Sequence, residues 1–113
     1  MKTASLAPGL YLVSTPLGNL GDLSPRARET LAGADLLLAE DTRTLVRLLS
    51  AAGVAPIPPH SSLRRENEAA RIPEILAALT QGKCVAYAAD AGTPGVCDPP
   101  ARLVREAGAA GHA

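Results

Sequence analysis

The chain has 113 residues, enough for one domain, and 47% of them are hydrophobic, which is sufficient for a buried core. Its 11 basic residues equal its 11 acidic residues, so the chain as a whole lacks a basic field that would attract RNA or an anionic membrane. Two tyrosines without any Phe or Trp also exclude an aromatic platform for stacking nucleic-acid bases.

Strand and helix signals alternate from the start of the chain. Leu10–Val13 is a short apolar run that predicts a first strand, and a glycine-bearing loop, 14–22, follows it. Ser24, followed by a proline, predicts the start of a helix that Gly33 ends. Leu36–Ala39 is apolar throughout, as strands covered on both faces are, and predicts a second strand.

The middle of the chain predicts two more helices. The first carries an apolar helical repeat and a terminating glycine: Leu45, Leu48, Leu49, Ala52 and Gly53. The proline-rich segment 54–59 leaves room only for a short strand near Ile57, and Ser61 and Ser62 are expected to cap the second helix. Pro73 lies inside that helical segment, where it either kinks one helix or begins another.

The last part of the chain repeats the order of strand, loop and helix. Cys84–Ala89 is a run of small apolar residues that predicts a buried strand, and a glycine- and proline-bearing loop, 90–95, follows it. Asp98, followed by a proline, is expected to begin a last helix that carries Leu103 and Ala107. The alternation indicates an α/β fold with a mainly parallel sheet of about four strands and helices on both faces.

Several classes of site are not expected. Two cysteines, Cys84 and Cys97, do not make a disulfide framework and predict reduced thiols of a cytoplasmic protein. No apolar run approaches the ~20 residues that span a bilayer, so no membrane contact is expected. His60 and His112 show no metal-ligand spacing with the cysteines, so no metal site is expected either.

Three loops follow strands directly, at 14–22, 40–43 and 90–95. Because the carboxyl ends of parallel strands share one edge of a sheet, we expect these loops to meet there. Glycine-bearing loops and helix N-termini at such an edge offer backbone N–H groups to small polar ligands. The sequence therefore predicts one ligand site at this edge.

Three sequence blocks then carry a resemblance: Leu10–Ala27, Ala39–Arg43 and Asp90–Pro99, the last reading D-A-G-T-P-G-V-C-D-P. In this order and spacing they resemble the amino-terminal domain of the ribosomal RNA small subunit methyltransferase I family, within the tetrapyrrole-methylase-like superfamily. The resemblance implies two α/β domains with S-adenosylmethionine between them. Residues 1–113 are expected to be the first domain, with the second absent. The sequence departs from the family pattern at Pro100, where glycine is expected, and a proline there removes a backbone N–H.

The resemblance implies methyl transfer from S-adenosylmethionine to the ribose 2′-hydroxyl of a cytidine in 16S rRNA, on the small ribosomal subunit in the cytoplasm. Half of the cofactor cleft would lie in the other domain, so this fragment is expected to be inactive alone. The family's next strand would lie beside Leu10–Val13, and without it that unpaired edge predicts a homodimer. The alternatives are a tetrapyrrole methyltransferase and a folded fragment without enzymatic activity.

The resemblance also points to site residues. Cofactor contacts are expected from the two glycine loops and the last helix cap: Pro16, Gly18, Asn19, Asp90, Ala91, Gly92, Thr93, Pro94 and Asp98. The attacking hydroxyl must give up its proton, for which Glu40, Asp41 and Asp90 are candidate acceptors. Arg43 is expected to pair with an RNA phosphate.

These expectations have purely structural alternatives. The glycine loops can be tight turns without a ligand. Asp41 or Thr42 can cap the helix that follows, with Arg43 in a local ion pair. A small basic cluster fits an RNA contact or, more readily, a solvated helix face: Arg64, Arg65 and Arg71.

Overall fold

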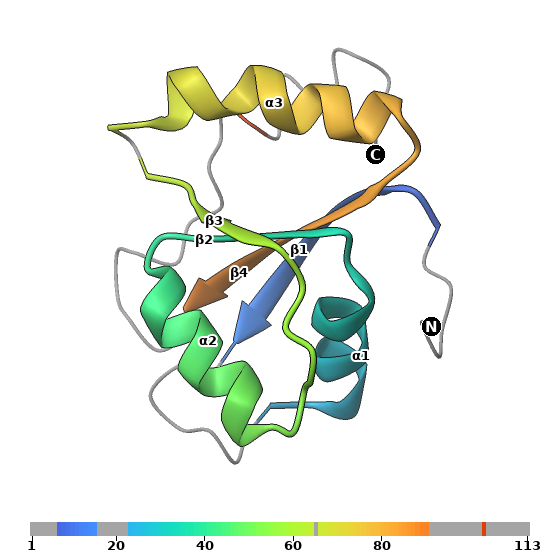
Figure 1. Ribbon diagram of the computed structural model, residues 1–113, viewed down its shortest axis with the longest axis vertical. Helices are drawn as coiled ribbons and strands as arrows, with labels where there is room; N and C mark the ends of the chain where they lie inside the picture. The colour runs from blue at the N-terminus through green and yellow to red at the C-terminus, as the bar shows by residue number, and fades with distance from the viewer. Residues whose placement is uncertain (1–6, 16–22, 65, 91–102, 104–113) are drawn as a thin grey trace.

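Four parallel strands form one sheet with helices on both of its faces (Figure 1). The computed structural model describes residues 7–15, 23–64, 66–90 and 103 of the chain. The elements are, in chain order, β1 (Gly9–Thr15), α1 (Pro25–Gly33), β2 (Leu36–Ala39), α2 (Thr42–Ala51), β3 (His60–Ser62), α3 (Glu68–Thr80) and β4 (Cys84–Asp90).

The sheet has the strand order β1-β4-β2-β3, and every neighbouring pair is parallel. The register places Thr15, at the end of β1, opposite Asp90, at the end of β4. Ala39, the last residue of β2, pairs with Ala88 on one side and with Ser62 on the other. The carboxyl ends of all four strands therefore lie along one edge, and the predicted parallel α/β sheet is confirmed.

Two apolar layers hold the helices to the sheet. Leu37 and Leu38 are neighbours in β2, and because successive strand side chains alternate, they point to opposite faces. Leu37 packs with Leu31 of α1 and Leu45 of α2, whereas Leu38 packs with Ile75 of α3. All five side chains are fully buried, and burying one of this size stabilises the fold by about 1.5–3 kcal/mol.

Local signals set several of the helix ends as predicted. Ser24 caps α1, because its Oγ accepts a hydrogen bond of 3.1 Å from the Ala27 N–H. Gly53 follows α2 and Gly82 follows α3, and both have a φ of +81°, a left-handed conformation that favours glycine. Of the two readings of Pro73, a second helix is not formed, since Pro73 lies within the single helix α3.

The third strand does not lie where the sequence predicts it. The prediction near Ile57 is wrong, and β3 is formed by His60–Ser62. Prolines lack the N–H that a strand ladder needs, so the proline-rich segment 54–59 cannot donate regularly to a neighbour. The Pro59 carbonyl can still accept, and it takes a hydrogen bond of 2.8 Å from the Leu37 N–H. Pairing with β2 therefore begins directly after the prolines.

The start of α3 is also corrected. Ser61 and Ser62 are expected as helix caps, but both are residues of β3. The N-cap position is taken by Asn67, whose side chain makes no capping hydrogen bond to the helix. The Asn67 side chain donates hydrogen bonds to Ser62 of β3 instead.

The structure describes one residue beyond β4, Leu103. It is helical, fully buried, and packed in the same apolar cluster as α3. The expected helix start at Asp98 and the expected helical residue Ala107 lie outside the described residues.

The face of the sheet on which each helix packs depends on the direction in which the chain moves from one strand to the next. The connections from β1 to β2 and from β2 to β3 run toward the β3 edge and carry α1 and α2 over one face. The return from β3 to β4 carries α3 over the other face, as right-handed crossovers require. Leu103 lies on the α3 face. A parallel strand reached from there by a right-handed crossover would lie beyond β1, next to its edge.

Candidate functional site

The ends of β1 and β4 meet at the centre of the predicted site. Thr15 is fully buried there, and its Oγ1 donates a hydrogen bond of 3.1 Å to the Ala89 carbonyl, which ties the two strand ends together. Asp90 lies opposite Thr15 in the register. Thr15 is not among the site residues predicted from the sequence, although a polar residue at the end of an apolar strand is a usable signal.

Most of the predicted cofactor contacts lie outside the described residues: Pro16, Gly18, Asn19, Ala91, Gly92, Thr93, Pro94 and Asp98. The described residues that immediately precede the two predicted loops are Thr15 and Asp90, and these two residues are neighbours across the sheet.

These two strand ends form a topological switch point. The chain that leaves β1 returns through α1 on one face, whereas Leu103, after β4, packs on the opposite face with α3. Between adjacent strands whose connections diverge in this way a crevice opens at the carboxyl edge, and ligands of open α/β sheets bind in such crevices. Because α2, which follows β2, also lies on the face opposite Leu103, fold and register favour a site at the end of β4, beside Thr15 on one side and the end of β2 on the other.

Glu40 and Asp41 follow β2 at the same edge, and Asp41 caps α2. Its Oδ1 accepts a hydrogen bond of 2.9 Å from the Arg43 N–H and lies 3.4 Å from Arg43 Nε. The Arg43 side chain is 85% exposed. The structural alternative of a cap with a local ion pair is thus formed. These hydrogen bonds from Arg43 lower the pKa of Asp41 below its ordinary value.

Asp41→Asn is expected to reduce stability at neutral pH but not in strong acid. Asparagine caps helices as well as aspartate does, so the substitution removes mainly the charge. Because the folded state lowers the pKa of Asp41, its carboxylate stabilises the fold above the unfolded pKa of about 3.9. That stabilisation is lost as the pH falls through the folded-state pKa. Urea unfolding followed by circular dichroism should show the difference between the two proteins closing in acid. A difference that stays constant with pH would contradict this account.

The carboxyl edge of the sheet, where the strands end, is called the rim below. The side chain of Tyr87 lies on the α3 face of the sheet. Tyr87 of β4 is buried in the cluster that includes Leu38. Burial raises the pKa of Tyr87, and the negative charges of Glu40 and Glu68 raise it further. The sequence gives no signal for this grouping, because it depends on how the strands pair.

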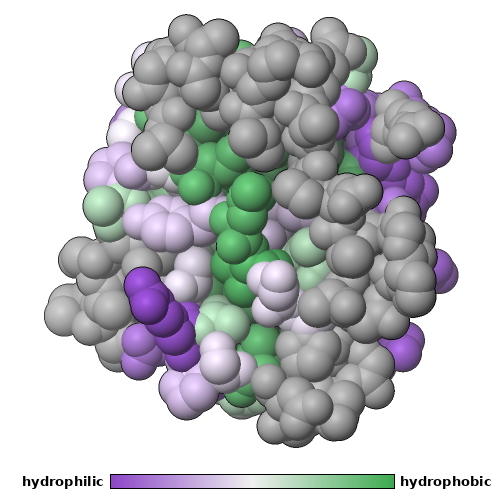
Figure 2. All heavy atoms as spheres, turned by 180° about the vertical axis from the view of Figure 1, so that it is seen from behind, coloured by the Kyte–Doolittle hydropathy of each residue, from purple (hydrophilic) through white to green (hydrophobic). Residues whose placement is uncertain are grey.

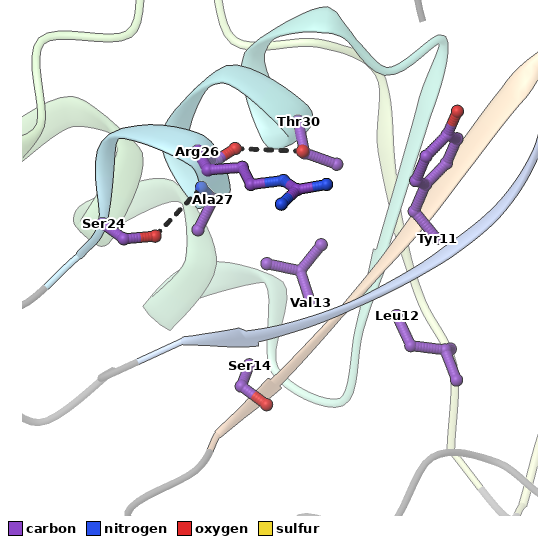
Figure 3. A pocket seen from close by; sticks show the side chains of 8 residues that line it. All are labelled: Tyr11, Leu12, Val13, Ser14, Ser24, Arg26, Ala27 and Thr30. Atoms are coloured by element: carbon purple, nitrogen blue, oxygen red, sulfur yellow. Dashed lines mark hydrogen bonds between the residues drawn. The ribbon is translucent and has the colours of Figure 1, made fainter. Parts of the chain in front are cut away.

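A separate groove of about 360 Å³ runs along the outer side of β1, against α1. Figure 3 shows Val13 and the Arg26 side chain directed into it, with Tyr11 at one end. The face of the molecule seen from behind carries a band of hydrophobic side chains in its middle (Figure 2). Among the described residues, Leu12 is the large hydrophobic residue that is exposed to solvent, with 48% of its surface accessible. This groove flanks the sheet edge and does not belong to the strand-end site.

Two further classes of site are absent from the described residues. No group of three or more His, Cys, Asp or Glu side chains there could hold a metal ion. Among the described helices, none combines the length and the hydrophobicity needed to cross a bilayer.

Comparison with known proteins decides the family. The sequence profile described as Tetrapyrrole (Corrin/Porphyrin) Methylases matches residues 9–113, nearly the whole chain. The chain belongs to the tetrapyrrole methylase family. This agrees with the resemblance carried by the three sequence blocks and with the parallel α/β sheet.

Within the tetrapyrrole methylases, similar proteins carry the name ribosomal RNA small subunit methyltransferase I. The protein of Synechocystis sp. is 48% identical over 89% of this chain and 36% of its own length. That of Neisseria meningitidis serogroup B is 48% identical over 88% of this chain and 34% of its own length. The protein of Mesorhizobium japonicum is 48% identical over 90% of this chain and 34% of its own length. The chain thus spans about a third of the length of these relatives.

Proposed function

We propose that this chain is the amino-terminal, cofactor-binding domain of an enzyme that methylates the ribose 2′-hydroxyl of a cytidine in 16S rRNA. The observation that carries the proposal is its 48% identity to relatives named ribosomal RNA small subunit methyltransferase I. The pairing of Thr15 with Asp90, the residues that precede the two predicted ligand loops, supports it physically. The proposed domain is residues 1–113, with the second half of the cleft in another domain.

The proposed cofactor is S-adenosylmethionine, which would supply an electrophilic methyl group on a sulfonium. Glu40 follows β2 at the carboxyl edge of the sheet, and its negative charge would complement the sulfonium cation of such a ligand.

The chain's own part in the chemistry would be to accept a proton. A neutral ribose hydroxyl is a weak nucleophile, and a general base works best when its pKa is near the operating pH. Asp41 suits this role least, because its pKa is lowered and its Oδ1 is engaged by Arg43. We therefore assign the base to Asp90, beside Thr15 at the switch point, with Glu40 as the second candidate.

The proposed partners follow from the same reading. Arg43, exposed at the rim, would contact the phosphate backbone of 16S rRNA in the small ribosomal subunit. The enzyme would act in the cytoplasm, where that RNA is found. The edge of β1, which has no partner among the described strands, would pair with a second copy of the chain to form a homodimer.

A chimera tests the function. This chain replaces the matching segment of the Synechocystis relative, and tritiated methyl incorporation is followed with bacterial small ribosomal subunits and, in parallel, with a corrin precursor. We expect incorporation into 16S rRNA that survives protease and is lost on ribonuclease digestion. Incorporation into the corrin alone would favour the tetrapyrrole alternative, and a folded chimera that methylates neither would refute the proposal. The isolated chain is expected to bind S-adenosylmethionine weakly; submicromolar affinity by calorimetry would contradict the need for a second domain.

A further inference from the structure

The structure separates two arginines that the sequence groups together. Arg71 is on α3 and pairs with Glu74 at 3.7 Å, as expected for a solvated helix face. Arg64 is not on a helix: it is exposed in the connection between β3 and α3, directly past the carboxyl end of β3. Arg64 therefore belongs to the same edge as the candidate site.

The Arg64 side chain is anchored to the end of β2. Its Nε donates a hydrogen bond of 2.9 Å to the Glu40 carbonyl. Arg43 is held one residue further along, by the carboxylate of Asp41. Two guanidinium groups are thus fixed to consecutive residues at the rim, one from α2 and one from the β3–α3 connection.

The two guanidinium groups differ in how much charge they keep. Arg43 faces a carboxylate, which offsets its positive charge. Arg64 is held by a neutral carbonyl, and none of the described residues places a carboxylate in an ion pair with it. A guanidinium has five N–H donors, so the anchor through Nε leaves the terminal nitrogens available. A planar fork of this kind suits phosphate oxygens.

Asn67 fixes the backbone that carries Arg64. Its Oδ1 accepts a hydrogen bond of 2.7 Å from the Arg64 N–H, and its Nδ2 donates to the carbonyl and the Oγ of Ser62, both at 3.3 Å. The Asn67 side chain thus bridges the end of β3 to the residue before the turn into α3. This use explains why it does not cap the helix.

We propose that Arg64 binds the RNA phosphate backbone beside the cofactor rim, and that Asn67 is the positioning residue that holds it there. This inference rests on the proposed function insofar as RNA is the substrate. It adds a phosphate contact on the β3 side of Arg43, so the RNA strand would run across the ends of β2 and β3.

The test measures binding of a fluorescein-labelled single-stranded RNA, copied from 16S rRNA, to the full chain by anisotropy between low and moderate salt. Arg64→Ala is expected to weaken binding about tenfold, the value of one charge-assisted hydrogen bond. It should also reduce the slope of log affinity against log salt by ~0.7, as for one phosphate contact to a single strand. Arg64→Lys should keep most of the slope.

Two further variants separate position from charge. Asn67→Ala removes no charge, so a weakened RNA affinity in this variant would report the loss of Arg64 positioning. Lys83→Ala removes one exposed positive charge just before the start of β4, at the opposite edge of the sheet, and should leave binding unchanged. Circular dichroism checks that each variant is folded.

Two results would overturn the inference. One is an Arg64→Ala protein that binds RNA no worse than Lys83→Ala, which would leave the methyltransferase proposal untouched. The other is a wild-type chain with no RNA affinity even at the lowest salt. Failure of the proposed function would appear separately, as a chimera that binds RNA but transfers no methyl group.

Discussion

Asp90→Asn is expected to slow methyl transfer by the chimera by about 10²–10⁴-fold, the usual contribution of a general base. Asparagine keeps the size and hydrogen-bonding shape of the side chain but cannot take up the hydroxyl proton. The position of Asp90 opposite Thr15, at the switch point, supports the choice. Single-turnover assays with saturating cofactor and small subunits would measure the chemical step directly.

The other two carboxylates serve as matched controls for Asp90. Asp41→Asn keeps the helix cap and removes a group whose pKa is already low, so the rate should change little. Glu40→Gln tests the second candidate. If Glu40→Gln slows the reaction strongly and Asp90→Asn does not, the base belongs at the end of β2. If neither matters, proton removal is not assigned to this chain.

Leu12→Lys is expected to convert the proposed homodimer into a monomer, halving the mass measured by light scattering. β1 has a paired neighbour on one side only among the described strands, and Leu12 leaves 48% of its surface exposed there. An open strand edge with exposed apolar surface invites pairing with another chain, and a lysine on the edge opposes it. The comparison is made at high protein concentration, where dimers are favoured.

A lysine elsewhere controls for the added charge. Ala69→Lys adds the same charge at an exposed position on α3, away from β1, and should leave the dimer intact. A wild-type chain that stays monomeric at every concentration would contradict the homodimer. So would a Leu12→Lys protein that is folded and still dimeric.

Those features of the fold that depend on neighbouring residues could be predicted. Leu36–Ala39 is the second strand with the predicted bounds, and Ser24 caps its helix as expected. An apolar run flanked by turn residues, or a serine before a proline, carries its own physical explanation. The shared edge of the loops also follows, because parallel strands require it.

Features that depend on pairing between distant segments could not be predicted. The third strand forms at His60–Ser62 because β2 lies beside it, and no local pattern marks so short and polar a run. The contact of Arg64 with the Glu40 carbonyl joins residues 24 apart in sequence. Neither its geometry nor the role of Asn67 can be derived before the strand order is known.

The edge of β1 that no described strand pairs with has a consequence for biosynthesis. Since right-handed crossover geometry directs a later strand to that edge, a second copy and a continuing chain would compete for the same row of backbone groups. A ribosome adds about 5–20 residues per second. A nascent longer protein of this family would thus emerge with the row exposed for on the order of seconds. On a crowded polysome, two neighbouring nascent chains would then be able to pair through their β1 strands before the synthesis of either is complete.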